Sequence, residues 1–102
     1  MSDEQLLDPV HPGDVLLEDF MKPLGLSQAQ LARAMRVPRV RVSQIVRKER
    51  GVTADTALRL ARVFGTSPQL WMNLQSQYDL EIAQRETGQA ISQEVEPLSA
   101  AG

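Results

Sequence analysis

The stretch LSQAQLARAMRVPRVRVSQIVRKER, residues 26–50, decides the fold. Ser27 followed by Gln30 is a capping box, which predicts a helix over residues 28–35. A second helix is predicted over residues 38–48, with a proline in its first turn. Two short helices joined by a tight turn are typical of a helix-turn-helix, whose second helix can enter the major groove of DNA.

The residues around the turn support this interpretation. A helix-turn-helix needs a small residue where its helices cross, and Ala32 occupies that place. Val42 and Ile45 are branched apolar residues on the second helix that can hold the crossing. The turn residue is usually glycine because its backbone takes a positive φ. Here it is Arg36, which departs from the pattern and is expected to take that conformation at a cost.

Three further helices flank this pair in the predicted fold. The first opens at His11-Pro12-Gly13 and closes at Gly25. Another is capped by Thr53 and ended by Gly65. The last opens at Ser67-Pro68, a cap followed by a first-turn proline. We therefore expect an all-α domain of five helices.

The chain of 102 residues has the size of one domain. We expect an acidic segment over residues 1–10 and the folded domain over residues 11–86. After Glu86 the apolar pattern decays through Thr87-Gly88 into polar residues, so a short flexible tail is predicted over residues 87–102.

Several classes of protein are disfavoured by composition. Without cysteine there is no disulfide framework and no thiolate nucleophile, and the lone histidine, His11, cannot make a usual metal site. Asp14 and Glu18 are four residues apart but lack an acid–base context. We expect neither an enzyme nor a cofactor. The longest apolar run is too short to span a membrane, so a cytoplasmic protein is predicted.

The net charge of −2 hides a strong asymmetry along the chain. Residues 1–22 carry six acids against one lysine, a balance of −5, and residues 73–102 carry five acids against one arginine, a balance of −4. Residues 23–72 carry nine bases against two acids, a balance of +7. A polyanion is expected to bind this central block.

The outer face of the second helix of the pair is the predicted DNA-reading surface. Arginine can bind guanine through O6 and N7, glutamine can bind adenine through N6 and N7, and valine can pack on a thymine methyl group. The base-reading candidates are Arg39, Val40, Ser43 and Gln44. The candidates for phosphate contacts are Gln28, Arg41, Arg47, Lys48 and Arg50.

The last helix offers surplus apolar surface. Its stripe is formed by Trp71, Leu74, Tyr78 and Ile82. Such a stripe is more often core than a ligand pocket. Because half-sites about 10 bp apart require a two-fold dimer, the same residues are also the candidates for a dimer interface.

Parts of the sequence resemble a known family. HPGDVLLEDFMKPLGLSQAQLARAM and GVTADTALRLARVFGTSPQLWMNLQSQYDLEIA look like the HigA-type antitoxins, a branch of the Xre helix-turn-helix regulators with a lambda-repressor-like fold. The match covers about residues 10–86. It implies a homodimer that binds double-stranded operator DNA in its own promoter. It also implies a partner, a small basic toxin of the HigB/RelE type, which is an mRNA endonuclease.

An acidic first helix suits a basic partner, because complementary charges raise the association rate. Asp14, Glu18 and Asp19 are therefore the candidates for toxin contact. One alternative is a stand-alone repressor of the same fold without a toxin. Another is a protein-interaction module that has lost DNA binding, which Arg36 and the net acidity favour and the +7 block disfavours.

Overall fold

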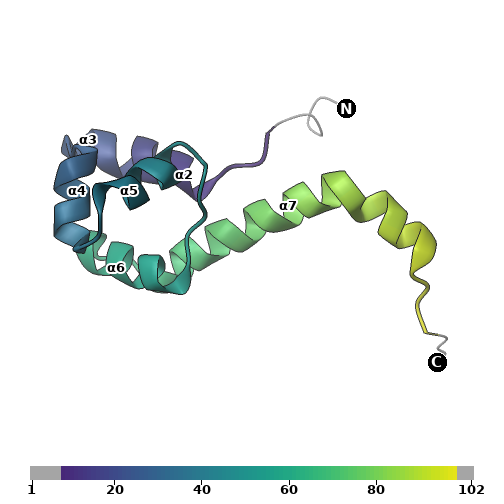
Figure 1. Cartoon of the computed structure of the whole chain (residues 1–102). Helices are drawn as coiled ribbons and strands as arrows, with labels where there is room; N and C mark the ends of the chain where they lie inside the picture. Colours follow the sequence, from purple (N-terminus) through teal and green to yellow (C-terminus); the bar gives the residue numbers. More distant parts are fainter. Residues whose placement is uncertain (1–7, 99–102) are drawn as a thin grey trace.

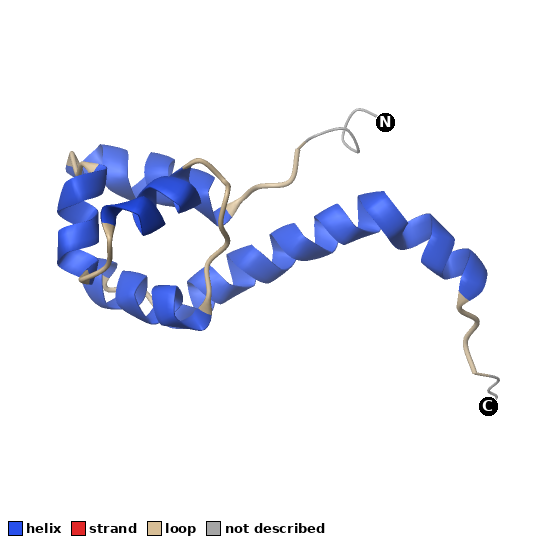
Figure 2. Cartoon of the chain, in the orientation of Figure 1, coloured by secondary structure: helices blue, strands red, loops and turns tan. Residues whose placement is uncertain are grey.

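The computed structural model describes residues 8–98, and the regular structure in this range is entirely helical (Figures 1 and 2). The chain forms α2 (Pro12–Val15), a π-helical segment η1 (Leu16–Met21), α3 (Lys22–Leu24), α4 (Gln28–Met35), α5 (Arg39–Val46), α6 (Ala54–Phe64) and α7 (Pro68–Glu94). α2, η1 and α3 follow one another without a break and make up the predicted first helix. The expected all-α fold of five helices is confirmed.

The first helix widens in its middle. The N–H of Lys22 donates to the carbonyl of Leu17, five residues back. Pro23 comes next, and it has no N–H to donate while its ring crowds the carbonyl four residues before it. A π-helical turn is a known way to accommodate such a disruption within a helix. Gly25 then ends the helix in the left-handed conformation, with φ 65°.

One hydrophobic core joins all the helices of the compact unit. Leu16, Leu31, Ile45 and Leu60 are fully buried within it. The indole of Trp71 also lies there, with ring centroids 5.1 Å from Phe20 and 6.5 Å from Phe64. Burying a large apolar side chain stabilises a fold by roughly 1.5–3 kcal/mol. The core therefore fixes α5 against the helices behind it.

The His11-Pro12-Gly13 motif anchors the start of the first helix. Nδ1 of His11 accepts a hydrogen bond of 2.9 Å from the N–H of Gly13 and so caps α2. The imidazole packs edge-on against Tyr78 of α7 with centroids 4.8 Å apart. Burial lowers the pKa of His11 below its ordinary value, which favours the neutral ring that can accept this bond. A Cβ added to Gly13 would overlap the carbonyl of Ile45.

The helix-turn-helix is built as the sequence predicted. The capping box is complete, because Ser27 accepts from the N–H of Gln30 and the Gln30 side chain accepts from the N–H of Ser27. Ala32 is buried where α4 crosses α5. Arg36 takes the left-handed conformation, with φ 61° and ψ 45°. The turn therefore has the glycine-type backbone with an arginine in it.

Two boundaries differ from the prediction. α5 ends at Val46 rather than near Lys48, because Lys48 is itself left-handed with φ 66°. α7 runs to Glu94, so residues 87–94, which the sequence placed in the flexible tail, are helical. Gly88 lies inside this helix, where glycine costs only about 1 kcal/mol relative to alanine. Of the segment predicted over residues 1–10, residues 1–7 lie outside the described residues.

α7 is the longest element of the described chain. Its first part packs on α6 and α2, and the rest extends away from the compact unit and bends (Figure 1). Despite its 27 residues, it is not apolar enough to cross a membrane, and neither is any other helix within residues 8–98.

We predict that Arg36→Gly raises the free energy of unfolding by about 0.5–1 kcal/mol. A left-handed residue with a Cβ costs about 1–2 kcal/mol, and the greater chain entropy of unfolded glycine offsets part of that gain. The measurement is the midpoint of urea denaturation followed by circular dichroism. Arg33→Gly, inside α4, is the matched control and should lower stability by about 1 kcal/mol. Equal destabilisation by both variants would contradict the strain at Arg36.

Candidate nucleic-acid interface

The outer face of α5 brings the four predicted base-reading residues together. Arg39 and Val40 stand in its first turn, and the side chain of Val40 is 53% exposed although it is apolar. Ser43 and Gln44 lie one turn further along the same helix and are half-buried. Positions four apart share a helix face, so these side chains form one continuous surface. Its opposite side, with Val42, is fully buried.

Gln44 is joined to another predicted DNA-binding residue. The Nε of Arg50 donates a hydrogen bond of 2.9 Å to Oε1 of Gln44. The main chain makes this contact possible, because the N–H of Glu49 donates to the carbonyl of Gln44 over 2.7 Å and turns the chain back over α5. Sequence reasoning assigned Gln44 to bases and Arg50 to phosphates, and did not foresee that they touch.

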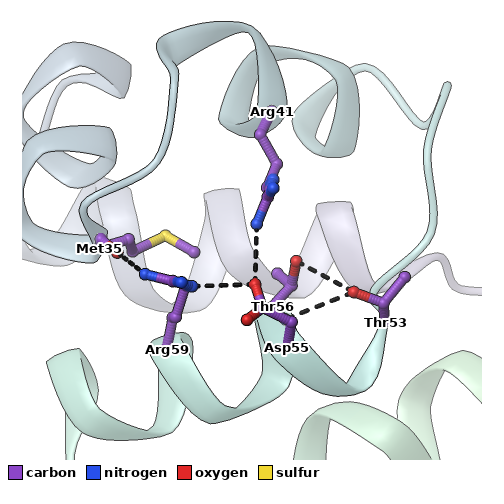
Figure 3. A network of polar contacts seen from close by, with 6 residues as sticks. All are labelled: Met35, Arg41, Thr53, Asp55, Thr56 and Arg59. Atoms are coloured by element: carbon purple, nitrogen blue, oxygen red, sulfur yellow. Dashed lines mark hydrogen bonds and ion pairs between the residues drawn. The ribbon is translucent and has the colours of Figure 1, made fainter.

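A second polar network ties α5 to the helices around it (Figure 3). Oδ2 of Asp55, in the first turn of α6, accepts hydrogen bonds of 2.9 Å from Arg41 of α5 and from Arg59 of α6. Arg59 also donates to the carbonyl of Met35, the last residue of α4, over 2.9 Å. Asp55 and Arg59 of α6 together thus connect this helix to α5 and α4.

Both arginines stabilise the charged form of the Asp55 carboxyl group. The hydrogen bond from Arg59, followed by that from Arg41, lowers the pKa of the Asp55 carboxyl below its usual range. Arg41 was predicted to hold a phosphate, and in the structure its guanidinium forms an ion pair with Asp55. Asp55 and Arg59 were absent from the predicted site. The signal for them was an acid inside a basic block, four residues before an arginine.

The other phosphate candidates surround α5. Gln28 is the first residue of α4 and is half-buried. Nη2 of Arg47 lies 3.4 Å from Glu49, and Nζ of Lys48 lies 3.6 Å from Oδ1 of Asp14. Pairs as exposed as these contribute little to stability, so a phosphate group can replace the carboxylate.

The three acidic candidates for toxin contact lie in the first helix. Asp14 is the partner of Lys48, as described above. Glu18 forms an exposed pair with Lys22 at 3.0 Å, and Asp19 is exposed next to it. The structure therefore places one of the three beside the predicted DNA-binding residues and the other two further along the helix.

The predicted dimer stripe is largely used inside the monomer. Trp71 is wrong as an interface residue, because its side chain is 0% exposed and its Nε1 donates to Oγ1 of Thr66 over 2.9 Å. Leu74 packs against the core and Tyr78 packs on His11, while Ile82 is half-buried. Exposed apolar side chains on α7 lie elsewhere, at Leu80 (63% exposed) and Ile91 (51% exposed).

Comparison with known proteins identifies the class of protein. The family model described as "Helix-turn-helix" matches residues 17–71, more than half of the chain. The chain belongs to this helix-turn-helix family. Its sequence is 51% identical over 77 residues to the virulence-associated protein I of Dichelobacter nodosus. The matched region spans 76% of this chain and 71% of that protein.

Solved structures narrow the class to the HigA-type branch. The Pseudomonas aeruginosa antitoxin HigA, solved with the higBA promoter, is 48% identical with a TM-score of 0.87, covering 89% of this chain and 99% of that one. An addiction module antidote protein of the HigA family from Coxiella burnetii is 44% identical with a TM-score of 0.85, over the same shares of both chains. The resemblance to HigA-type antitoxins is thereby confirmed.

Proposed function

We propose that this protein is an antitoxin that binds operator DNA as a homodimer, represses its own operon and neutralises a small basic mRNA endonuclease of the HigB/RelE type. The observation that carries the proposal is the outer face of α5, where Arg39 and Val40 are exposed on a helix whose other side is fully buried. A rigidly held helix with exposed polar and apolar groups is what major-groove reading requires. Likeness to an antitoxin solved with its promoter supports the same conclusion.

At this surface we assign sequence reading to base contacts and affinity to phosphate contacts. Arg39 suits guanine O6 and N7, and Val40 suits a thymine methyl group. Gln28, Arg47 and Lys48 flank α5 and suit the backbone, where they set affinity without reading sequence. Arg41 keeps α5 in place through Asp55, so its role is to position the reading helix.

A two-fold dimer is needed to read two half-sites, and α7 supplies a surface for it. One face of the helix beyond the core forms an open groove of about 260 Å³, whose lining residues all belong to α7. They are Leu80, Ala83, Gln84, Gly88, Ile91 and Ser92. Exposed leucine and isoleucine around small residues is a composition that lets a second helix approach closely.

The order of these residues suits pairing of two antiparallel copies. With a two-fold axis between residues 85 and 86, Leu80 faces Ile91 of the partner subunit, and Ala83 faces Gly88 of the partner subunit. Each large side chain then meets a large one, and each small residue meets a small one. A symmetric interface requires such self-complementarity. The dimer surface we propose is therefore further along α7 than the sequence suggested.

We predict that Arg39→Ala lowers the preference for operator over random duplex by about 5- to 150-fold, the range for loss of one bidentate base contact. Competition binding followed by fluorescence anisotropy measures this ratio. Arg62→Ala, on the exposed side of α6, removes the same charge away from α5 and should leave the ratio unchanged. Arg47→Ala should weaken binding to every sequence and lower the salt slope by about one unit. An unaltered preference in Arg39→Ala would place the reading helix elsewhere.

Light scattering after size exclusion tests the dimer. The protein should elute at about twice its chain mass of 11.3 kDa, and Leu80→Glu should reduce this to the mass of one chain. A buried carboxylate at the paired helices would be desolvated without a partner. Leu58→Glu alters a leucine of nearly equal exposure, 61%, on α6, and should remain dimeric. A Leu80→Glu protein that stays dimeric would exclude this face of α7.

Toxin neutralisation separates the antitoxin from a stand-alone repressor. Co-expression with the product of the neighbouring gene should give a stable complex heavier than the homodimer. Asp19→Lys should weaken that complex, because it reverses an exposed charge on the first helix, while operator binding stays unchanged. Asp79→Lys, on α7, is the matched control for net charge. A neighbour that elutes separately would favour the repressor without a toxin.

A further inference from the structure

The contact between Gln44 and Arg50 fixes which way the Gln44 amide faces. Arginine has only hydrogen-bond donors, so the group that receives the bond from its Nε must be the amide oxygen. Oε1 of Gln44 accordingly lies 2.9 Å from Nε of Arg50. The amide is planar, and its Nε2 is directed to the other side. Gln44 thus presents its NH₂ donor on the side away from Arg50, while Oε1 keeps one lone pair next to the guanidinium.

The loop after α5 holds Arg50 in this place. Lys48 turns the chain with its positive φ of 66°, and the N–H of Glu49 closes the turn on the carbonyl of Gln44. Arg50 is exposed, whereas Gln44 is half-buried beside it. In the groove this pair would be shielded from water, and a charge-assisted hydrogen bond becomes stronger in such surroundings.

The two purines differ in what they offer to such a pair. In the major groove, adenine presents an acceptor at N7 and an amino donor at N6, whereas guanine presents acceptors at both N7 and O6. Bidentate binding of adenine requires Oε1 of glutamine to accept from N6. Here a guanidinium already takes one of the two lone pairs of Oε1. An adenine N6 amino group that used the other lone pair would lie beside the cationic guanidinium, donor next to donor. Guanine O6 meets no such conflict and can accept from either side chain.

We propose that Gln44 and Arg50 act as one donor-rich unit that selects guanine, so that Arg50 determines specificity at the base that Gln44 reads. This rests on the proposed binding of operator DNA through α5. It reverses the ordinary expectation that an isolated glutamine prefers adenine. It also gives Arg50 a role that phosphate binding alone would not give, because the side chain works through the orientation of its neighbour.

Selection from a library of randomised duplexes tests the proposal with the full chain. The base pair whose preference disappears in Gln44→Ala identifies the position that Gln44 reads, and the wild-type protein should select guanine there. Arg50→Met keeps a side chain of similar length without a donor and frees Oε1. It should shift the ratio of adenine to guanine at that position by about tenfold toward adenine, within the range for one bidentate contact.

Arg47→Met is the matched control, because it removes the same charge from the same turn at a residue paired with Glu49. It should weaken binding without changing the selected base, and thermal unfolding should show that both variants remain folded. Unchanged guanine selection in Arg50→Met, or selection of adenine by the wild type, would overturn the role of Arg50 while leaving operator binding intact. Failure of the wild type to enrich any sequence would overturn DNA reading itself, and the inference with it.

Discussion

The close approach of the first helix to α5 is the constraint on which the reading face depends. Gly13 lies so near the carbonyl of Ile45 that a single added carbon would overlap it. His11 holds the same turn by capping α2 and by packing on Tyr78. Any larger residue at Gly13 must displace one of the two helices. The orientation of α5 is therefore determined by residues of the first helix that need not contact DNA.

The residues that distinguish this sequence from a generic helix-turn-helix share that supporting role. Thr53 caps α6, and Asp55 in its first turn binds Arg41 of α5. Oε1 of Gln75 on α7 accepts a 2.7 Å hydrogen bond from the N–H of Val52, and Gly51 leaves room for the amide. The end of the α5–α6 loop that leads into α6 is thus fixed. These contacts join motifs that are separated along the chain.

Most of the fold could be predicted from local sequence signals. Ser27 and Gln30 act within one turn of helix, so a capping box can be recognised without knowing the rest of the chain. The left-handed backbone at Arg36 was likewise expected from its position alone. The length of α7 was not predicted, because Thr87-Gly88 resembles a helix end. Glycine inside a helix has only a modest cost, so the helix continues through it.

Questions about partners could not be answered from residue types. Periodicity shows that Trp71 faces something apolar, and only the packed structure shows that this is its own core. The same holds for Arg41 and Gln44, whose side chains meet residues 14 and 6 positions away. Hydrophobic spacing specifies which side of a helix is covered. It does not specify with which polar or charged group an exposed side chain forms a hydrogen bond.

The ion pair between Lys48 and Asp14 has a thermodynamic consequence for regulation. Its lysine stands among the proposed phosphate contacts and its carboxylate among the proposed toxin contacts. A ligand that takes either member leaves the other unpaired and ready for a second ligand. By linkage, each ligand then favours the other by the same factor. An exposed pair limits that factor to a modest value. For an antitoxin of the proposed kind, the coupling at this point would strengthen repression slightly when toxin is bound.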